Sequence, residues 1–515
     1  MDSIPVGVPV EELAAQANSI ASASGVQVEK RRDDGSTYFE CAPMSLLPNA
    51  YPKQAFAQAQ TLAPHFNRLV DRVSRDADFL QQTLGGGVSD TDPYTAKLLK
   101  LYQEIYCGQD DNFAKTADYM GIHRSDYMLH KGADDKYHIK QVELNTIASS
   151  FASLSTKVAA LHRHVTSRFE ADVKELLQAN KEKVVGTKGG DDDGVPINPA
   201  LEQIPKAMAV AFSQYVSRFS PSNAVIVFVV QDGETNTVDQ RMLEHRLWSD
   251  HQIPVVRMSL TRAHTEIERN DSTGALTITA TGQEVAILYF RAGYAPTDYP
   301  DGYDGVEWQA RAKLEQSRAT KSPALGYHLA GTKKVQQELA RPGVLERFFP
   351  DDTAAVEGLR AAFAGLYSLG EDATTEDKAA VKDVLLSGAE GGYVLKPQRE
   401  GGGYNFYGEQ LAAKLKENVK VTGDDVELAP VLGEFILMER LFPPMQRAIL
   451  LRGGKVEGSG DTISELGCFA AVVASKDGNI LHNEYAGFLL RTKFANVDEG
   501  GVASGFATLS SPYLC

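Results

Sequence analysis

The chain has 515 residues, of which 43% are hydrophobic and 23% are charged, a balance typical of globular proteins. At about 150 residues per domain, this length suggests roughly three domains. Asp and Glu outnumber Lys and Arg by 68 to 52, a net charge of −16, which argues against nucleic-acid binding through a basic surface but allows a locally basic pocket for a small anion.

Compartment and membrane attachment can also be predicted. The most apolar short run, 224–230, is far shorter than the ~20 residues that span a bilayer, and no basic stretch followed by an apolar one begins the chain. Cys41, Cys107, Cys468 and Cys515 form no C-x-x-C pair, which excludes a zinc ribbon or a dithiol redox motif and favours a reducing compartment. We therefore expect a cytoplasmic protein that binds neither membrane nor nucleic acid.

The first part of the chain is expected to be mostly helical. Apolar residues recur at helical spacing over 10–25 and 52–84, and a further helix is expected over about 153–180. Residues 137–145 alternate in character, which predicts a strand. Residues 186–196 are rich in Gly and Asp without periodicity, which predicts a surface loop or a disordered insert.

The pattern changes near residue 222. Strands at 224–230, 255–258 and 284–290 with a helix at 236–249 predict a small α/β domain with parallel pairing that ends near Pro323. In the last third, helices at about 353–366 and 376–387 precede a series of strands, which predicts an antiparallel sheet. These strands are expected at 393–396, 433–438, 447–452, 464–474 and 480–491. No internal repeat is evident.

The segment at 396–405, Lys-Pro-Gln-Arg-Glu-Gly-Gly-Gly-Tyr-Asn, is the sharpest local feature. Lys396 leaves a predicted strand, and three glycines would let backbone N–H groups approach an anion closely. A flexible hairpin turn is the alternative, but the flanking Lys, Arg and Glu favour a phosphate-binding loop. It is no P-loop, because Gly-Lys-Ser/Thr is absent, and Phe406 stands where a dinucleotide fingerprint needs its third glycine.

Two oxygen-bearing side chains share one face of the strand at 137–145. Glu143 and Asn145 are two residues apart, so both point to the same side of the strand. A carboxylate and an amide oxygen side by side suit Mg²⁺. Two polar residues on a solvated face are the commoner alternative, unless a third oxygen ligand such as Glu400 joins them.

Two other pairs could bind anions. Arg491 and Lys493 share a strand face ahead of the small-residue loop at 500–505, and could hold a carboxylate and a phosphate or form a solvated basic edge strand. Arg291 and Tyr294 follow the strand at 284–290, where α/β domains bind ligands, and would fit a carboxylate. A capping turn is the alternative there.

Several other reactive side chains are interpreted as structural. His162 and His164 lie in a helical run and point to different faces, so surface or core positions are favoured over metal binding. Cys468 lies in an apolar strand and is expected in the core rather than as a nucleophile.

Taken together, seven segments resemble eukaryotic-type glutathione synthetases of the ATP-grasp superfamily. They occur in the order of that family over roughly residues 10–515, and the stretches at 329–339 and 396–403 are highly specific. The matching segments are 123–128, 143–146, 289–294, 329–339, 395–403, 464–467 and 490–493.

The resemblance implies a mixed α+β and α/β architecture, namely a permuted ATP-grasp fold. Residues 1–221 would be its mostly helical first part, 222–326 an inserted α/β substrate-binding domain, and 327–515 the C-terminal part with a glycine-rich antiparallel lid at about 340–435. It also implies a homodimer that uses ATP and Mg²⁺ to join γ-glutamylcysteine and glycine into glutathione. The cysteinyl carboxylate of the dipeptide would be phosphorylated, and the glycine amine would attack the acyl phosphate.

The resemblance further implies four groups of site residues. Magnesium would be held by Glu143, Asn145 and Glu400, and catalysis would involve Arg291, Lys396 and Arg491. The nucleotide would contact Lys333, Lys396, Gln398, Arg399, Gly401, Gly402, Gly403, Asn405, Tyr407, Met438, Glu439, Arg440, Leu441, Glu465, Lys493 and Glu499. The dipeptide and glycine would contact Arg124, Ala148, Ser149, Ser150, Glu234, Thr235, Asn236, Gln240, Arg291, Tyr294, Arg491, Val502 and Ala503.

Four positions depart from the usual residues of the family. Tyr404 replaces an asparagine, Ala148 a serine, Glu499 an aspartate and Arg440 a lysine. None of these changes removes a predicted magnesium ligand or phosphate-binding lysine, so we expect an active enzyme.

Three other functions remain open. A ligase for β-alanine would make homoglutathione, although the small wall of Val502 and Ala503 favours glycine. A non-catalytic nucleotide-binding regulator could use the same fold, but it would tolerate the loss of Glu143 or Glu400, and both are present. A kinase that phosphorylates a carboxylate and stops would release ADP without an amine.

Overall fold

A mixed sheet of 13 strands runs through the computed structural model, which describes residues 5–86, 88–89, 92–108, 112–132, 134–186, 194–397, 405–423 and 425–515. Across the sheet the order is β19 (Gln446–Arg452), β3 (Met44–Ser45), β22 (Thr508–Ser510), β21 (Ile480–Phe494), β20 (Lys455–Ala474), β5 (Tyr119–Lys131), β12 (Thr320–Ser322), β11 (Glu284–Phe290), β10 (Leu276–Ile278) and β9 (Ile267–Arg269). In addition, β6 (Tyr137–Asn145) pairs with β5, β7 (Ala224–Val229) with β11, and β8 (Val255–Met258) with β7.

The large sheet joins a parallel part to an antiparallel part. Strands β7, β8, β11 and β12 pair in parallel, whereas β5, β6, β19, β20 and β21 pair antiparallel. The predictions of parallel pairing after residue 222 and of an antiparallel sheet in the last third are therefore confirmed. The two parts meet where Lys321 of β12 pairs with Tyr119 of β5, a continuity that local patterns did not indicate.

Helices cover both faces of this sheet. Alternate side chains explain the apolar run at 224–230: Val225 and Val227 face one core, and Ile226 and Phe228 face the other, as in other doubly covered sheets. One face packs against α2 (Lys53–Ser74), α3 (Ala77–Leu84), α5 (Pro93–Tyr102), α10 (Leu260–Glu266), α11 (Val306–Glu315), α12 (Leu325–Ala330), α13 (Lys333–Leu339), α14 (Val344–Phe348) and α15 (Thr353–Ala362). The other packs against α1 (Val10–Ser24), α6 (Ala152–Arg168), α7 (Glu170–Val185), α8 (Ala200–Phe219) and α9 (Thr237–His251).

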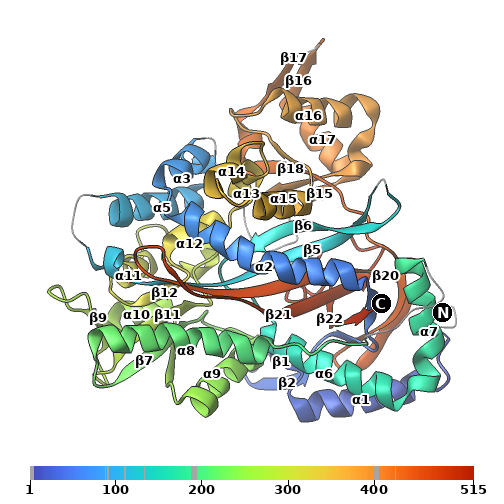
Figure 1. Ribbon diagram of the computed structural model, residues 1–515, viewed down its shortest axis with the longest axis horizontal. Helices are drawn as coiled ribbons and strands as arrows, with labels where there is room; N and C mark the ends of the chain where they lie inside the picture. The colour runs from blue at the N-terminus through green and yellow to red at the C-terminus, as the bar shows by residue number, and fades with distance from the viewer. Residues whose placement is uncertain are drawn as a thin grey trace.

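The helical spacing expected over 52–84 is confirmed, but it belongs to two helices, because α2 ends at Ser74 and α3 begins at Ala77. The apolar residues of α2 at three- and four-residue spacing, including Phe56, Phe66, Leu69 and Val70, are all buried, which is the pattern of a helix with one face on a core. Figure 1 shows α2 lying across β20 and β21.

A second, smaller sheet is antiparallel throughout, with the order β13 (Leu366–Ser368), β18 (Phe435–Glu439), β14 (Tyr393–Pro397) and β15 (Phe406–Tyr407). The helices α16 (Thr375–Ser387) and α17 (Gly408–Asn418) pack on it around a core of its own, and a hairpin of β16 (Val419–Thr422) and β17 (Asp425–Leu428) follows. In Figure 1 this small sheet stands at the top of the view, above β5 and β6.

Several short elements did not follow from local patterns. The hairpin of β1 (Gln27–Arg31) and β2 (Thr37–Cys41) and the strands β3 and β4 (Asn49–Tyr51) interrupt a region expected to be mostly helical. Both β3 and β4 find partners at the far end of the chain, β22 and β23 (Pro512–Leu514). Pairing over such a separation leaves little signal in a local window. The predicted loop at 186–196 lies mostly outside the described residues.

The residues interpreted as structural are placed accordingly. His162 is buried between the hydroxyl of Ser511, at 2.6 Å, and the carbonyl of Ser45, at 2.9 Å, while His164 is exposed. Cys468 is buried in the core, and all four cysteines are free thiols. Within the described ranges, no helix has the length and apolar character that crossing a membrane requires.

The start of α6 depends on a carboxylate from another helix. Asp239 of α9 is buried and accepts the backbone N–H groups of Phe151 at 2.7 Å, Ser153 at 2.8 Å and Leu154 at 3.1 Å. These are N–H groups that a helix cannot satisfy internally. Burial raises the pKa of Asp239, an effect that Arg291 and these hydrogen bonds oppose.

We expect Asp239→Ala to lower the free energy of unfolding by about 3 kcal/mol, because it leaves buried N–H groups without an acceptor. Urea denaturation followed by circular dichroism measures the change. The matched control is Asp250→Ala on the same helix, where a partly exposed ion pair to Arg246 at 3.0 Å predicts less than about 1 kcal/mol. Equal losses for the two variants would contradict the capping role.

Candidate active site

Strand register brings the predicted site residues together at the middle of the large sheet. Between β5 and β6, Arg124 lies opposite Asn145 and Asp126 opposite Glu143. Between β20 and β21, Glu465 lies opposite Arg491. Because β5 and β20 are also neighbours, these pairs form one continuous polar surface.

Asp126, which sequence analysis did not single out, is the centre of this surface. Its side chain is fully buried and accepts hydrogen bonds from Arg124 at 2.6 and 2.8 Å, from Arg491 at 2.7 Å and from Asn145 at 3.0 Å. Arg491 also donates to Glu465. One buried carboxylate therefore orients two predicted substrate-binding arginines and one predicted magnesium ligand. The only available signal was its position inside the 123–128 segment.

Glu143 and Asn145 lie side by side, as their spacing predicted. The amide nitrogen of Asn145 is 3.2 Å from the Glu143 carboxylate. Burial alone would raise the pKa of Glu143, but Lys333, Arg491, Lys396 and Arg124 lower it to about 2. Glu143 is therefore ionised at neutral pH within a group of cations.

A carboxylate and an amide oxygen are a suitable partial ligand set for a hard divalent cation. The third predicted ligand, Glu400, lies outside the described residues. Among the residues that are described, His, Cys, Asp and Glu side chains form no group of three placed to hold a metal ion.

Three lysines approach this surface from different elements. Lys333 begins α13, Lys396 lies on β14 of the small sheet and Lys493 lies on β21. The ammonium group of Lys396 is 3.3 Å from the carbonyl of Val142 on β6, so the two sheets meet here. Burial lowers the pKa of both Lys396 and Lys493 to about 8, although Glu143 opposes this shift at Lys396 and Glu499 opposes it at Lys493.

Of the other residues predicted to bind nucleotide, those within the described ranges lie around this junction. Met438 is buried on β18 opposite Val394, Glu439 accepts the N–H of Gly365 at 3.0 Å, and Leu441 is buried. Gln398, Arg399, Gly401, Gly402, Gly403 and Tyr404 lie outside the described residues.

The loop that follows β21 and contains Asp498 and Glu499 also contacts the small sheet. Glu499 accepts hydrogen bonds from the backbone and the side chain of Asn405, at 3.2 and 3.3 Å. Arg440 pairs with Asp498 at 2.8 Å and stacks over the ring of Tyr407 at 5.3 Å. The substituted residues Glu499 and Arg440 therefore both connect the small sheet to this loop.

Two predicted substrate-binding arginines converge on the loop at 148–150. Arg291 donates to the carbonyl of Ser149 at 2.9 Å and to the hydroxyl of Ser150 at 2.5 Å, and Arg124 donates to the carbonyl of Ser150 at 3.3 Å. Ala148 has a φ of 51°, a left-handed conformation that is uncommon outside glycine and often stored at functional sites.

A second polar group follows β7 and β11. Glu234 accepts hydrogen bonds from the side chain of Gln240 at 2.5 Å and from the N–H of Asn236 at 2.7 Å. It also raises the pKa of Arg291 through its charge, so the two groups are electrostatically connected. Arg257, which was not predicted, donates to Gln240 at 2.8 Å.

The remaining predicted substrate-binding residues lie less directly in this surface. Tyr294 accepts a hydrogen bond from Gln231 at 3.1 Å, and the carbonyl of Thr235 accepts the N–H of Glu29 at 3.1 Å. Val502 is buried in a core cluster, and Ala503 is exposed.

Together, the fold and the site define a protein of two sheets with a cation-rich site at their junction. Comparison with known proteins is specific: the family model described as "Eukaryotic glutathione synthase, ATP binding domain" matches residues 9–514. The chain therefore belongs to the eukaryotic glutathione synthase family, as the sequence resemblance indicated.

Individual relatives agree with this assignment. The chain is 41% identical over 481 residues to the chloroplastic glutathione synthetase of Solanum lycopersicum, covering 92% of this chain and 78% of that one. It is 37% identical over 508 residues to the glutathione synthetase of Homo sapiens, covering 98% and 97%. A glutathione synthetase-like effector from Globodera pallida shares the fold, with a TM-score of 0.71 at 21% identity over 98% of this chain and 97% of that one.

The depressed pKa of Glu143 predicts a pH-dependent stability. An unfolded glutamate protonates near 4.5, whereas the pKa of folded Glu143 is about 2, so its ionised form stabilises the fold above pH 5 and this contribution is lost as the pH falls toward 2. We expect Glu143→Gln to cost about 2 kcal/mol at pH 6.5 and less than half of that at pH 3.

Urea denaturation at both pH values, with a chelator present, measures this difference. Glu104→Gln, which alters a glutamate with a half-exposed side chain, is the control. Its free energy of unfolding should match that of the wild type at both pH values. A cost for Glu143→Gln that is independent of pH would mean that the surrounding cations do not stabilise its charge.

Proposed function

We propose that this chain joins γ-glutamylcysteine to glycine at the expense of ATP, forming glutathione, ADP and phosphate. The observation that carries the proposal is the placement of ionised Glu143 and Asn145 within the field of Lys333, Lys396, Arg491 and Arg124. Family membership over residues 9–514 supplies the identity of the reaction.

The arrangement suits phosphoryl transfer. ATP and a carboxylate substrate repel each other, so catalysis requires positioning and charge neutralisation more than covalent chemistry. The resemblance implies that Lys333 and Lys396 would contact the phosphates, and both lysines act through their charge on Glu143 of the same site. Glu143, Asn145 and Glu400 would hold Mg²⁺, whose charge would offset that of the phosphates.

The substrate-binding arginines would orient the dipeptide. An oxygen of the cysteinyl carboxylate would attack the γ-phosphorus of ATP, and ADP would leave. The amine of glycine would then attack the acyl carbon, lose a proton and displace phosphate. Arg491 lies beside Arg124 on the shared carboxylate of Asp126 and would border the reacting carboxylate. The site must exclude water, because an acyl phosphate hydrolyses.

The organisation inferred from the resemblance belongs to the same proposal. We infer a permuted ATP-grasp fold with parts at 1–221, 222–326 and 327–515 and a lid at about 340–435. The small antiparallel sheet with α16 and α17 would be the body of that lid. The resemblance implies that the loop at 398–407, with Asn405 and Tyr407, would close over the phosphates. A homodimer in the cytoplasm is also proposed, although two relatives are named chloroplastic.

Phosphate release from purified protein with Mg²⁺ and ATP tests the function, with γ-glutamylcysteine and glycine added singly and together. Release that requires both, with glutathione detected by mass spectrometry, is the expected result. Release with the dipeptide alone would favour a kinase, and nucleotide binding without release would favour a regulator. Faster turnover with β-alanine than with glycine would favour homoglutathione synthesis.

We expect Arg291→Ala to raise the KM for γ-glutamylcysteine at least about 10-fold, because it removes a charged hydrogen-bonding group worth about 1.5–3 kcal/mol. The KM for ATP should stay within about twofold, since the predicted nucleotide residues lie on other strands. Steady-state kinetics with each substrate varied in turn measures both.

Arg318→Ala is the matched control for that variant. Arg318 pairs with Glu284 at 2.6 Å at the opposite end of β11, so its loss removes an arginine and its hydrogen-bonded partner contact away from the proposed site. An equal rise in both KM values for Arg291→Ala would contradict a substrate-binding role.

A further inference from the structure

Two adjacent lysines begin α13 and engage different parts of the molecule. Lys333 acts on Glu143 and Lys396 through its charge. The ammonium group of Lys334 instead donates to Asp372 at 2.6 Å, to the hydroxyl of Ser368 at 2.7 Å and to Gln337 at 2.8 Å. Consecutive helical residues point about 100° apart. One short helix can therefore place Lys333 near Glu143 and Lys334 against Asp372.

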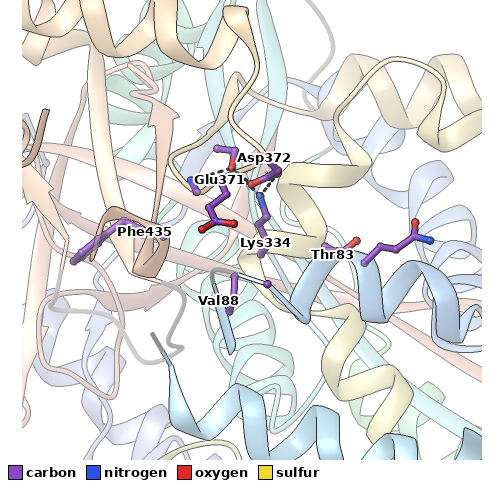
Figure 2. Close-up of a pocket in the computed structure, with 11 residues that line it drawn as sticks. Thr83, Val88, Lys334, Glu371, Asp372 and Phe435 are labelled. Atoms are coloured by element: carbon purple, nitrogen blue, oxygen red, sulfur yellow. Dashed lines mark hydrogen bonds and ion pairs between the residues drawn. The ribbon is translucent and has the colours of Figure 1, made fainter. Parts of the chain in front are cut away.

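The Lys334 ion pair joins α13 to the small sheet. Ser368 ends β13, and Asp372 lies in the loop that leads from β13 to α16. Asp372 also accepts a hydrogen bond from Ser368 at 2.8 Å and pairs with Arg341, just beyond α13, at 2.8 Å. Figure 2 shows Lys334 of α13 directed at Asp372 in the loop that follows β13.

The small sheet connects this ion pair to the proposed nucleotide site through its strand pairing. β13 pairs with β18, and β18 pairs with β14, so the attachment is one strand away from Met438 and two strands away from Lys396. The positions of Lys333 and Lys396 relative to each other therefore depend on how the small sheet is held against α13.

Two clefts border Asp372 and therefore lie beside this ion pair. One, of about 170 Å³, is bounded by Thr83 of α3 and by Glu371 and Phe435 of the small-sheet region (Figure 2). A second, of about 250 Å³, lies toward Arg341 and also borders Asp372. Both clefts are open to solvent, so close packing does not bridge the elements there and polar contacts carry more of the restraint.

We propose that Lys334 and Asp372 are positioning residues for nucleotide binding. Their ion pair holds the small sheet on the helix that carries Lys333 and so maintains the spacing between Lys333 and Lys396 that a polyphosphate requires. The inference rests on the proposed function, because it assigns these residues to the same nucleotide site.

Asp372→Asn and Lys334→Met test the pair, singly and together. We measure the Kd for ADP with Mg²⁺ by calorimetry, the KM values for ATP and γ-glutamylcysteine, and the thermal midpoint without ligand. Asp372→Asn should weaken ADP binding about 5- to 10-fold and raise the KM for ATP similarly, with the dipeptide KM within twofold. In free-energy terms, the loss of ADP binding in the double variant should be smaller than the sum of the two single losses, because residues that act through one pair are not additive.

Glu371→Gln is the matched control, since it removes the same charge from the neighbouring exposed position. Among the described residues, the Glu371 side chain forms no ion pair, and its substitution should leave the Kd unchanged. Because the Asp372 side chain is 41% exposed, Asp372→Asn is expected to fold even if Lys334→Met does not.

Three results would overturn the inference. If Asp372→Asn binds ADP as Glu371→Gln does, the pair does not position the site. A lower thermal midpoint with an unchanged Kd would assign the pair a purely structural role. If the wild-type protein fails to bind ADP with Mg²⁺, the proposed function fails and this inference fails with it, an outcome distinct from the first two.

Discussion

The buried carboxylate of Asp126 is the interaction on which the site and the centre of the large sheet both depend. A charge with no solvent exposure is tolerated only when it is paired and hydrogen-bonded, and here Arg124, Arg491 and Asn145 supply the partners. These residues come from β5, β6 and β21, so the pairing fixes three strands relative to one another. On β20 between them, a Cβ at Gly467 would lie 2.8 Å from both Arg124 and Asp126, so glycine is required for the carboxylate and guanidinium to fit.

A cation-rich site within a chain of net charge −16 requires local compensation. Lys333, Lys396, Arg124 and Arg491 would repel one another in a confined space, and Glu143 supplies the opposing charge, as its pKa of about 2 reflects. Burial lowers the pKa of Lys396 to about 8, so at neutral pH the protonated ammonium group is favoured over the neutral amine by only a small margin. Additional negative charge, such as a polyphosphate, would stabilise the protonated lysine, so the field favours an anionic ligand although the surface as a whole is acidic.

Local periodicity predicted the elements that carry most of the fold, but it did not predict the contacts between them. The strands β6, β7 and β21 have apolar or alternating patterns visible within ten or twenty residues, so the expected and observed ranges agree closely. The helical range expected over 52–84 is divided in the structure into α2 and α3. The roles of Asp126 and Asp239 were not predicted, because they depend on Arg491 and Phe151, which lie far away along the chain. The Glu143 and Asn145 pair was found from its spacing alone, whereas most other site residues came from resemblance to a family.

Where β14 and β18 of the small sheet meet β6 of the large sheet, one part of the contact is apolar and another is charged. This division determines which kind of ligand the site can bind. Met438 of the small sheet is buried in an apolar cluster against Val142 and Met128 of the large sheet. On the charged side, Lys396 reaches the carbonyl of Val142. Side chains on β6 alternate, so Val142 presents an apolar surface while Glu143 faces the cations. A ligand lying along the boundary would meet an apolar wall and then a charged one, which matches a nucleotide, whose base is flat and weakly polar and whose phosphates are strongly anionic.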